Sequence, residues 1–492
     1  MAAPVGVGWM ALFAAAAAGL GWAGLDAYGN RHWRHETGSA FGAASWATKR
    51  KLERAGLFGP EGVALGRFAG KLLRVKSDRH LLTVAPNRAG KGVSSIIPNL
   101  LTWPGSMVVV DPKGENAVVT ARRRRDMGQL VHVLDPWGVS GLPRSRFNPL
   151  LWLEPFGEGL AEDAALIADS LVASEGEGEA RFWLNEARAL IAGLIMHVAT
   201  VETPQHRHLG RVRELLTEGE DSFSALLNEM AGNNAASGLV ARAARRLMQK
   251  SRRERSSVIS TAQAETHFLD TQAMANVLAA SDFDLQSLKQ GRMTVYLVLP
   301  ADRLATHGRW LRLMVGLCLA ELTRKCRPPA HSVLFLLDEF AALGRLQAIE
   351  TAMGLLAGYG VQLWPVLQDF SQLQDLYPRR WRSFLANAGV VQAFGVNDMG
   401  TAEYLSSLLG TRTVTVRQRS RNAASGAHGG AESYGPAARP LLMPHEIMQL
   451  PAYQQLVLLQ GQAPILADKI RYYAEPEFAG LFDVNPMVGG KA

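Results

Sequence analysis

The sequence predicts an α/β protein with a mainly parallel sheet, an inserted all-helical region and a membrane-spanning helix near its N-terminus. From residue 81 onwards, short continuous apolar runs alternate with helical periods, a pattern typical of parallel strands buried on both faces. The alternation stops over residues 160–290, which show helical periods and almost no strand signal. Residues 2–25 contain no charged side chain.

The strand signal lies in seven runs, and helical segments between them indicate crossover units of a parallel sheet. The runs are 81–84, 107–110, 130–134, 293–299, 333–337, 361–367 and 390–396. Residues 30–80 are basic and mixed, and we interpret them as a juxtamembrane stretch. After residue 410, the alternating TRTVTVRQR predicts a hairpin strand, and we expect the Gly- and Ser-rich remainder up to residue 440 to be a loop.

The composition excludes several classes of protein. With 492 residues, 48% of them apolar, the chain can bury a large core. Its two cysteines exclude a disulfide scaffold and a multi-cysteine zinc site. The net charge of +8 favours a polyanion or a membrane surface as partner, although such an excess also occurs on proteins that bind neither.

The uncharged segment 2–25 is long enough to span a bilayer, and Trp9 and Trp22 lie near its ends, where interfacial aromatic residues belong. Basic residues such as Arg31 and Arg34 follow the run, so the positive-inside rule predicts a single-pass protein with the bulk of the chain in the cytoplasm. A cleaved signal peptide, which would need a basic start, and a buried helix of a soluble protein are the alternatives.

Residues 85–92, Ala-Pro-Asn-Arg-Ala-Gly-Lys-Gly, lie between a predicted strand and a predicted helix, as a phosphate-binding loop requires. Backbone N–H groups of such a loop surround the phosphates, and Lys91 would place its ammonium group on the β- and γ-phosphates. Ala85 replaces the first glycine of the motif, and Gly92 replaces its magnesium-binding hydroxyl, so an ordinary glycine turn is the alternative. The predicted nucleotide-binding residues are Asn87, Arg88, Ala89, Gly90, Lys91, Gly92 and Val93.

A second signal is the segment 334–339, in which four apolar residues precede two carboxylates at a predicted strand end. We predict that Asp338 holds Mg²⁺ and that Glu339 is the catalytic group that activates the attacking water. The alternative is that both residues cap the next helix. Together with Lys91 in one parallel-sheet pattern, they predict an ATPase that uses ATP and Mg²⁺.

Other polar residues support this site or lie apart from it. Gln368 ends the next predicted strand, where it could sense the γ-phosphate or be a surface amide. Asp111 and Lys113 end another strand, and a supporting role near the loop is an open interpretation. We interpret Arg122–Arg125 as a solvated helix face rather than a DNA contact. A denser cluster in the helical region could bind a phosphate backbone, anionic lipid or cargo: Arg242, Arg245, Arg246, Lys250, Arg252, Arg253 and Arg255.

Several segments, in the right order, resemble the type IV coupling proteins, the TraG-like membrane ATPases of conjugation and type IV secretion. They are PNRAGKGVSSIIPNLLTWPGSMVVVDPKGEN (86–116), Phe182-Trp183 with Ala187-Arg188, LLDEFAALG (336–344), VLQDFSQL (366–373), NAGVVQAFGVND (387–398) and RPLLMPHEIMQLP (439–451). The resemblance covers residues 40–475 and is more specific than either nucleotide motif alone. Glycine is tolerated in that family at the position of Gly92.

The resemblance implies a RecA-like P-loop nucleotide domain, a homo-hexameric ring with ATP at the subunit interfaces, and Gln368 as a catalytic sensor. It implies that hydrolysis drives single-stranded DNA with its relaxase, or protein effectors, into the channel of a type IV secretion system at the bacterial inner membrane. The predicted parts are a transmembrane anchor (1–29), a first nucleotide-binding segment (30–159), an inserted all-α domain (160–290) and a second nucleotide-binding segment (291–492).

The sequence departs from that family in two ways. Family members usually carry two transmembrane helices, and here one candidate is visible. Some relatives place an arginine that acts across the interface where this chain has Ala357, which leaves Arg345, Arg379 and Arg380 as candidates. Two other hypotheses are a hexameric DNA pump of chromosome partitioning and a cargo receptor that binds nucleotide without hydrolysing it; the inserted helices and the Phe-Trp motif favour the coupling protein.

Overall fold

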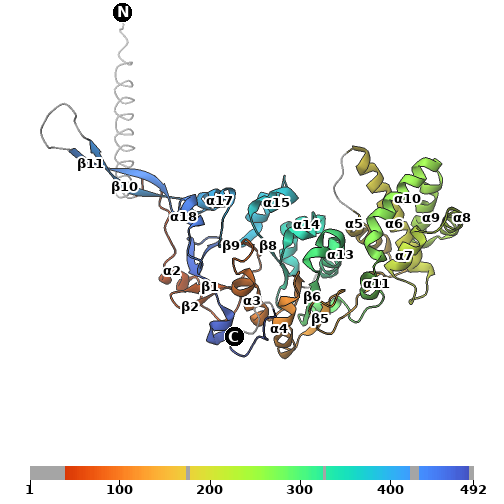
Figure 1. The fold of residues 1–492 in the computed structure, drawn as a ribbon, viewed down its shortest axis with the longest axis horizontal. Coiled ribbons are helices and arrows are strands. Elements are labelled where there is room, and N and C mark those ends of the chain that lie inside the picture. The colour runs from red at the N-terminus through yellow and green to blue at the C-terminus, as the bar shows by residue number, and fades with distance from the viewer. Residues whose placement is uncertain (1–38, 173–177, 325–327, 421–430, 487–492) are drawn as a thin grey trace, which may run out of the picture. The chain divides into compact units, whose positions relative to one another are not determined.

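The computed structural model describes residues 39–172, 178–324, 328–420 and 431–486 (Figure 1). The chain divides into two compact units, Met1–Trp46 with Asp398–Gln449, and Ala47–Asn397 with Leu450–Ala492. Each unit is described by itself. The predicted membrane anchor at 1–29 lies outside the described residues, and the predicted limits of the four parts stay predictions.

The larger unit is built on a sheet in which seven neighbouring strands are all parallel. In sheet order they are β9 (Ala388–Ala393), β3 (His80–Val84), β8 (Val361–Leu367), β7 (Val333–Leu337), β4 (Met107–Asp111), β6 (Met293–Val298) and β5 (Leu130–Leu134). All but β5, at the edge, are buried along their whole length, which explains their continuous apolar sequences. The predicted mainly parallel sheet is confirmed.

Four antiparallel strands extend this sheet beyond β9 to eleven strands, in the order β2-β1-β13-β12-β9. They are β1 (Val63–Phe68), β2 (Lys71–Val75), β12 (Gln454–Leu459) and β13 (Ile465–Asp468). The β1–β2 hairpin lies inside the stretch 30–80, for which the sequence predicted only a juxtamembrane segment. Its turn is Ala69-Gly70, both at positive φ, and alanine gives no turn signal of the kind that Asn-Gly gives.

Helices cover both faces of the parallel strands (Figure 1). On one side α3 packs on α4, and on the other α13 packs on α14, which packs on α16. The helices of this part are α2 (Lys49–Arg54), α3 (Ile97–Thr102), α4 (Glu115–Asp126), α13 (Leu304–Thr323), α14 (Gln347–Leu355), α15 (Phe370–Leu376) and α16 (Trp381–Asn387). Short 3₁₀ turns lie at Pro149–Leu151, Ala301–Arg303, Phe340–Leu343, Leu356–Tyr359, Tyr472–Ala474 and Pro476–Phe478.

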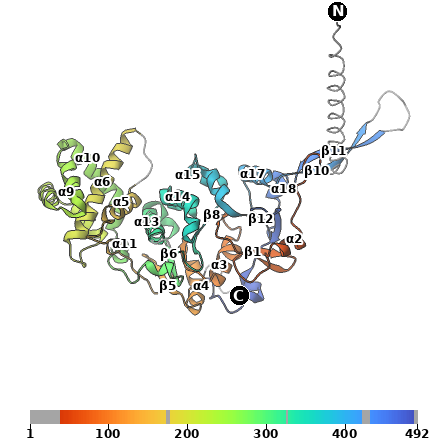
Figure 2. The same ribbon diagram turned by 180° about the vertical axis from the view of Figure 1, so that it is seen from behind.

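Between β5 and β6, the described residues from 160 to 290 contain helices and no strand (Figure 2). They are α5 (Leu160–Leu171), α6 (Gly178–Val201), α7 (Leu209–Leu216), α8 (Glu220–Gly232), α9 (Ala235–Met248), α10 (Arg252–Thr266), the 3₁₀ turn η3 (His267–Asp270), α11 (Gln272–Leu278) and α12 (Gln286–Lys289). Among the described residues, α6 is the one helix long and apolar enough to cross a membrane, but 61% of its apolar window is buried. It packs on α5, α9 and α10, as a core helix does.

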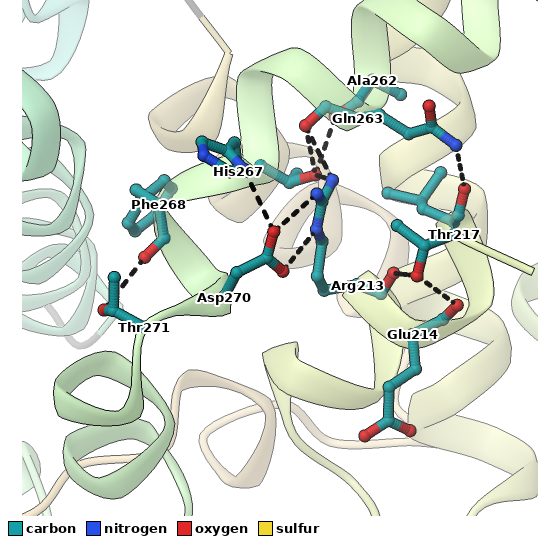
Figure 3. A network of polar contacts seen from close by, with 11 residues as sticks. Arg213, Glu214, Thr217, Ala262, Gln263, His267, Phe268, Asp270 and Thr271 are labelled. Carbon is teal, nitrogen blue, oxygen red and sulfur yellow. Dashed lines mark hydrogen bonds and ion pairs between the residues drawn. The ribbon is translucent and has the colours of Figure 1, made fainter.

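A partly buried guanidinium connects three of these helical segments (Figure 3). Arg213 of α7 donates to both carboxylate oxygens of Asp270, each at 2.7 Å, and to the carbonyl oxygen of Gln263 in α10 at 2.7 Å. These hydrogen bonds lower the pKa of Asp270, which also receives a contact from His267 at 3.1 Å. The two hydrogen bonds to Asp270 fix α7 against η3, and the bond to Gln263 fixes it against α10.

The smaller unit contains α17 (Met399–Leu409), the two-stranded ribbon of β10 (Thr411–Ser420) and β11 (Ala431–Pro440), and α18 (Pro444–Met448). The predicted hairpin strand is therefore present. The expectation of a loop is wrong at 431–440, where β11 pairs with β10 along its whole length, and residues 421–430 lie outside the described ones. The Ala-, Gly- and Pro-containing sequence of β11 gives no strand signal by itself, so pairing with β10 decides its structure.

Candidate nucleotide site

The predicted phosphate loop, residues 85–92, connects β3 to a helix start, as the motif requires. Arg88 and Gly90 have positive φ angles of 64° and 91°, and the N–H of Ala89 donates to the carbonyl of Pro86 at 3.2 Å. Ala85 is fully buried and is not among the residues with positive φ, so this position does not need glycine. The loop is a strained turn opening on a helix N-terminus, whose first N–H groups have no intrahelical partner.

The helix after the loop begins with a wide π turn, Gly92–Ile96, in which Ile97 N–H donates to Gly92. Pro98 explains the change from α-helical pairing, because its nitrogen cannot donate to the carbonyl four residues back. The side-chain amide of Asn99 instead donates to Ser95 O at 2.7 Å. Gly92 offers no hydroxyl, and the hydroxyl of Ser94 is bonded to Gly90 O at 2.8 Å.

The structure brings four of the predicted residues into contact at the carboxyl ends of β3, β7 and β8. Lys91 Nζ lies 2.7 Å from Glu339 Oε1 and 3.1 Å from Asp338 Oδ1. Gln368 Nε2 donates to the other oxygen of Glu339 at 3.1 Å. The carboxyl edge of a parallel sheet is where such folds bind ligands. Of the loop residues, Asn87 and Arg88 are exposed.

Asp338 and Glu339 do not cap the next helix. Glu339 has a left-handed backbone conformation (φ 51°, ψ 48°), and its side chain accepts no hydrogen bond from the following turn. Its own N–H donates to Asp338 Oδ1 at 3.0 Å. A non-glycine residue held at positive φ costs free energy, and such residues cluster at functional sites. The helix-cap alternative is therefore wrong.

Burial and charge act in opposite directions on these groups. Burial raises the pKa of Asp338, despite Lys91 beside it. Burial alone would also raise the pKa of Glu339, but the hydrogen bond and charge of Lys91 bring it below its usual value. Burial would lower the pKa of Lys91, and the two carboxylates raise it instead. At neutral pH Glu339 is therefore ionised, and the ammonium group of Lys91 is shared between Glu339 and Asp338.

Asp111, at the end of β4 beside β7, is a third carboxyl group at this edge. It is 1% exposed and accepts the backbone N–H of Ala117 at 2.8 Å. Burial raises its pKa to about 7, and the charge of Asp338 contributes. Lys113, in the same turn, helps to lower the pKa of Glu339. Both residues therefore act electrostatically on the site, as one of the two interpretations of the sequence expected.

Lys469, the residue after β13, is a further residue at this site that the sequence did not predict. Its ammonium group donates to the carbonyl oxygen of Ala89 in the phosphate loop at 2.7 Å and lies 5.0 Å from the centre of the Phe394 ring. The two bonded residues are 380 positions apart, and no motif in the sequence marks Lys469. The antiparallel extension of the sheet, which the sequence analysis also missed, places it there.

The candidates for a trans-acting cation have different surroundings. Glu350 of α14, whose side chain is 6% exposed, pairs with Arg345 at 3.4 Å and with Arg380 at 3.1 Å. Arg380 is 66% exposed. Arg379 is exposed, and none of the ion pairs described here includes it.

The basic residues of the Arg122–Arg125 run and of the cluster in the helical region differ from one another in burial and in ion pairing. Arg124 is fully buried and donates to Thr294 and to the carbonyl of Gly105, so this member of the Arg122–Arg125 run is a core residue and not part of a solvated face. In the helical region, Glu186 pairs with two members of the denser cluster, Arg246 at 3.1 Å and Lys250 at 3.0 Å, and offsets part of their charge. Lys250 also lies 5.2 Å from the ring centre of Phe182.

A parallel sheet that carries this loop and these carboxylates at one edge defines the class of the RecA-like P-loop nucleoside triphosphatases. The chain matches the family described as "Type IV secretory system Conjugative DNA transfer" over residues 35–485. It therefore belongs to this family, the TraG- and VirD4-like coupling proteins, as the resemblance implied.

Named relatives and solved structures agree with this assignment. The conjugal transfer protein TraG of Escherichia coli is 29% identical over 476 residues, which cover 88% of this chain and 74% of TraG. Protein VirD4 of Rhizobium rhizogenes is 30% identical over 465 residues, which cover 90% of this chain and 67% of VirD4. The plasmid coupling protein TrwB, solved with the ATP analogue ADPNP, is 19% identical with a TM-score of 0.65 and shares the fold over 88% of this chain and 96% of that one.

Proposed function

We propose that this chain hydrolyses ATP at the loop 87–93 and uses the energy to move a conjugative substrate. Lys91 binds the β- and γ-phosphates, Glu339 activates the attacking water, and Gln368 orients Glu339 and senses the γ-phosphate. The observation that carries the proposal is the contact of Lys91 with both Asp338 and Glu339. It joins the phosphate loop to the two carboxyl groups that hydrolysis needs, and the lysine offsets part of their negative charge until nucleotide phosphates compete for it.

The residues present fit Mg²⁺ held by one carboxylate, Asp338, together with nucleotide phosphates and water, the usual arrangement for this ion. Among the described residues, no three His, Cys, Asp or Glu side chains converge as a metal-binding group. A side chain at Gly92 would meet open space, so the missing hydroxyl leaves room for water there. TrwB has been solved with ADP and Mg²⁺, which supports the same pair here. Bound Mg²⁺ would neutralise developing phosphate charge.

We further propose that the substrate is single-stranded DNA with its relaxase, or a protein effector, delivered to the channel of a type IV secretion system. The family description, conjugative DNA transfer, supports DNA. On the helical region, Phe182 is 44% exposed, contacts Trp183 edge-on and lies under Lys250. Exposed aromatic rings beside cations are what single strands bind, through base stacking and phosphate contacts.

The working assembly we propose is a homo-hexameric ring anchored in the inner membrane by residues 1–29, with the rest of the chain cytoplasmic. In a ring, a neighbour's cation would reach the γ-phosphate. Arg380 fits this role better than Arg379, because Glu350 holds it in a defined position while two thirds of its surface stays exposed. Ala357 cannot supply that charge.

The test is ATP hydrolysis by the detergent-purified chain, with and without single-stranded DNA. We expect DNA-stimulated turnover that disappears in Lys91→Ala and Glu339→Gln. For the neighbour's cation, inactive Glu339→Gln chains mixed with inactive Arg380→Ala chains should recover part of the activity, and Arg379→Ala is the matched control that stays active alone. Tight ATP binding by assembled rings without any turnover would contradict the proposal and favour a nucleotide-binding cargo receptor.

A further inference from the structure

The antiparallel strands that extend the sheet contact the phosphate loop through one side chain, that of Lys469. Lys469 follows β13, and its own N–H is fixed to Tyr453 O at 2.7 Å. Its ammonium group donates to the carbonyl of Ala89 at 2.7 Å, and a Cβ built on Gly90 would lie 3.7 Å from it. Lys469 therefore contacts the loop at its two residues before Lys91.

The bonded carbonyl belongs to the part of the loop with the most unusual backbone. Ala89 lies between Arg88 and Gly90, both at positive φ. A loop that directs its N–H groups at phosphates must direct carbonyl groups away from them, because a carbonyl dipole facing a phosphate repels it. A partly buried carbonyl also needs a donor. Lys469 supplies that donor and so fixes the orientation of this peptide group.

The charge of the ammonium group has no carboxylate partner among the residues that the structure describes. Among the described ion pairs none includes Lys469, and its contacts are the Ala89 carbonyl and the face of Phe394. Burial lowers the pKa of Lys469, and nearby Arg471 lowers it further. A cation held beside a phosphate loop without an acidic partner strengthens the attraction for a polyphosphate.

A second connection lies beneath the loop and fixes the same strands. The buried amide of Gln392 in β9 accepts from Thr83 of β3 at 3.0 Å and from Ser95, after the loop, at 3.1 Å. Its amide group contacts Gln455 of β12, which donates to Asp468 O at 3.1 Å, the residue before Lys469. The backbone that carries Lys469 is thus fastened to both flanks of the loop.

We propose that Lys469 is a positioning residue of the nucleotide site, one that holds the Ala89 carbonyl outward and adds positive potential for the polyphosphate. This inference rests on the proposed ATPase function. It predicts weaker nucleotide binding, with little change in the chemical step, when Lys469 is replaced.

The experiment compares Lys469→Met, Lys469→Arg and, as matched control, Lys76→Met in the full-length detergent-purified chain. Lys76 is an exposed lysine paired with Glu61, outside the nucleotide site. Lys469→Met should raise KM for ATP at least about tenfold, the lower end of what loss of a charged hydrogen bond costs, with kcat within about twofold of wild type. Lys469→Arg should restore most of the affinity, because a guanidinium can donate to the same carbonyl. Lys76→Met should behave as wild type.

Binding of a fluorescent ADP analogue, measured in parallel, should weaken in the same order, and it separates the two proposals. If the wild type binds the analogue but does not turn over ATP, the proposed function fails while Lys469 is still judged by affinity. If Lys469→Met does not fold, Lys469→Gln replaces it. Unchanged affinity and KM, a fall in kcat alone, or failure of arginine to restore binding would each overturn the inference.

Discussion

Lys91 Nζ donates a hydrogen bond to Glu339 Oε1 at 2.7 Å, across 248 positions of sequence. The same ammonium group lies 3.1 Å from Asp338 Oδ1. Without nucleotide, the phosphate-binding lysine thus offsets part of the negative charge of the two acidic side chains with which it shares the site. Nucleotide phosphates would compete for this lysine, so binding should release Glu339 from Lys91 and free it for its proposed work as a base.

The first prediction separates binding from chemistry. Lys91→Ala should abolish both nucleotide binding and turnover, because the phosphates lose their cation. Glu339→Gln should keep binding close to wild type and lower kcat by about 100-fold or more, since a neutral amide cannot act as a general base. Binding of a fluorescent nucleotide and steady-state hydrolysis measure the two effects. Wild-type turnover in Glu339→Gln would remove this residue from the mechanism.

The second prediction concerns the pH profile. Gln368 donates to Glu339, and this contact helps to lower the pKa of Glu339. Gln368→Glu would place a second carboxylate beside Glu339 and raise the pKa of Glu339. Since the base must be ionised, the acid limb of the kcat profile should move to higher pH, and the loss of rate should be larger at pH 6 than at pH 8. Gln374→Glu, on the exposed side of α15, is the control and should leave the profile unchanged.

The third prediction tests the buried amide network under the phosphate loop. Gln392→Leu would leave the hydroxyls of Thr83 and Ser95 and the carbonyl of Leu65 without this partner. Each buried polar group left unsatisfied costs about 1–3 kcal/mol, so the free energy of unfolding should fall clearly. Denaturant titration measures it, and the exposed Gln460→Leu should change it by no more than about 0.5 kcal/mol. Equal effects of the two substitutions would contradict the network's role.

The fourth prediction links stability to pH in the helical region. Arg246 and Lys250 lower the pKa of Glu186, and its side chain is 7% exposed. The carboxyl group of Glu186 therefore binds its proton less tightly in the folded protein than in the unfolded chain. The stabilisation is complete above the ordinary value of 4.5 and is lost as pH falls through the lower folded value.

Glu186→Gln should accordingly lower the free energy of unfolding at pH 7 by about 1.5–3 kcal/mol, the value of a hydrogen bond to a charged group. The difference from wild type should shrink below pH 4. Thermal unfolding across this range measures it, with the exposed Glu218→Gln as control. A difference that is constant with pH would show that the ion pairs do not contribute.

Much of the fold could be predicted from the sequence, because its central strands are buried on both faces and so are continuously apolar. All seven predicted parallel strands are present, and the helical stretch between β5 and β6 follows the helical periods. The antiparallel strands β1, β2, β12 and β13 gave no such signal. They lie at the margin of the sheet, where polar and glycine residues interrupt the apolar pattern, and β11 is a strand because β10 pairs with it.

The sequence by itself determined the class of the site, since Lys91, Asp338, Glu339 and Gln368 each end a strand or follow one, and parallel strands bring such ends together. The tertiary structure alone decided how these residues meet: that Lys91 is shared between two carboxylates, and that Glu339 is strained rather than a cap. The tertiary structure also decided that Lys469 donates to the carbonyl of Ala89 and that Arg124 is buried in the core. Contacts between residues hundreds of positions apart depend on the order of the strands in the sheet, and local sequence patterns carry no information about that order.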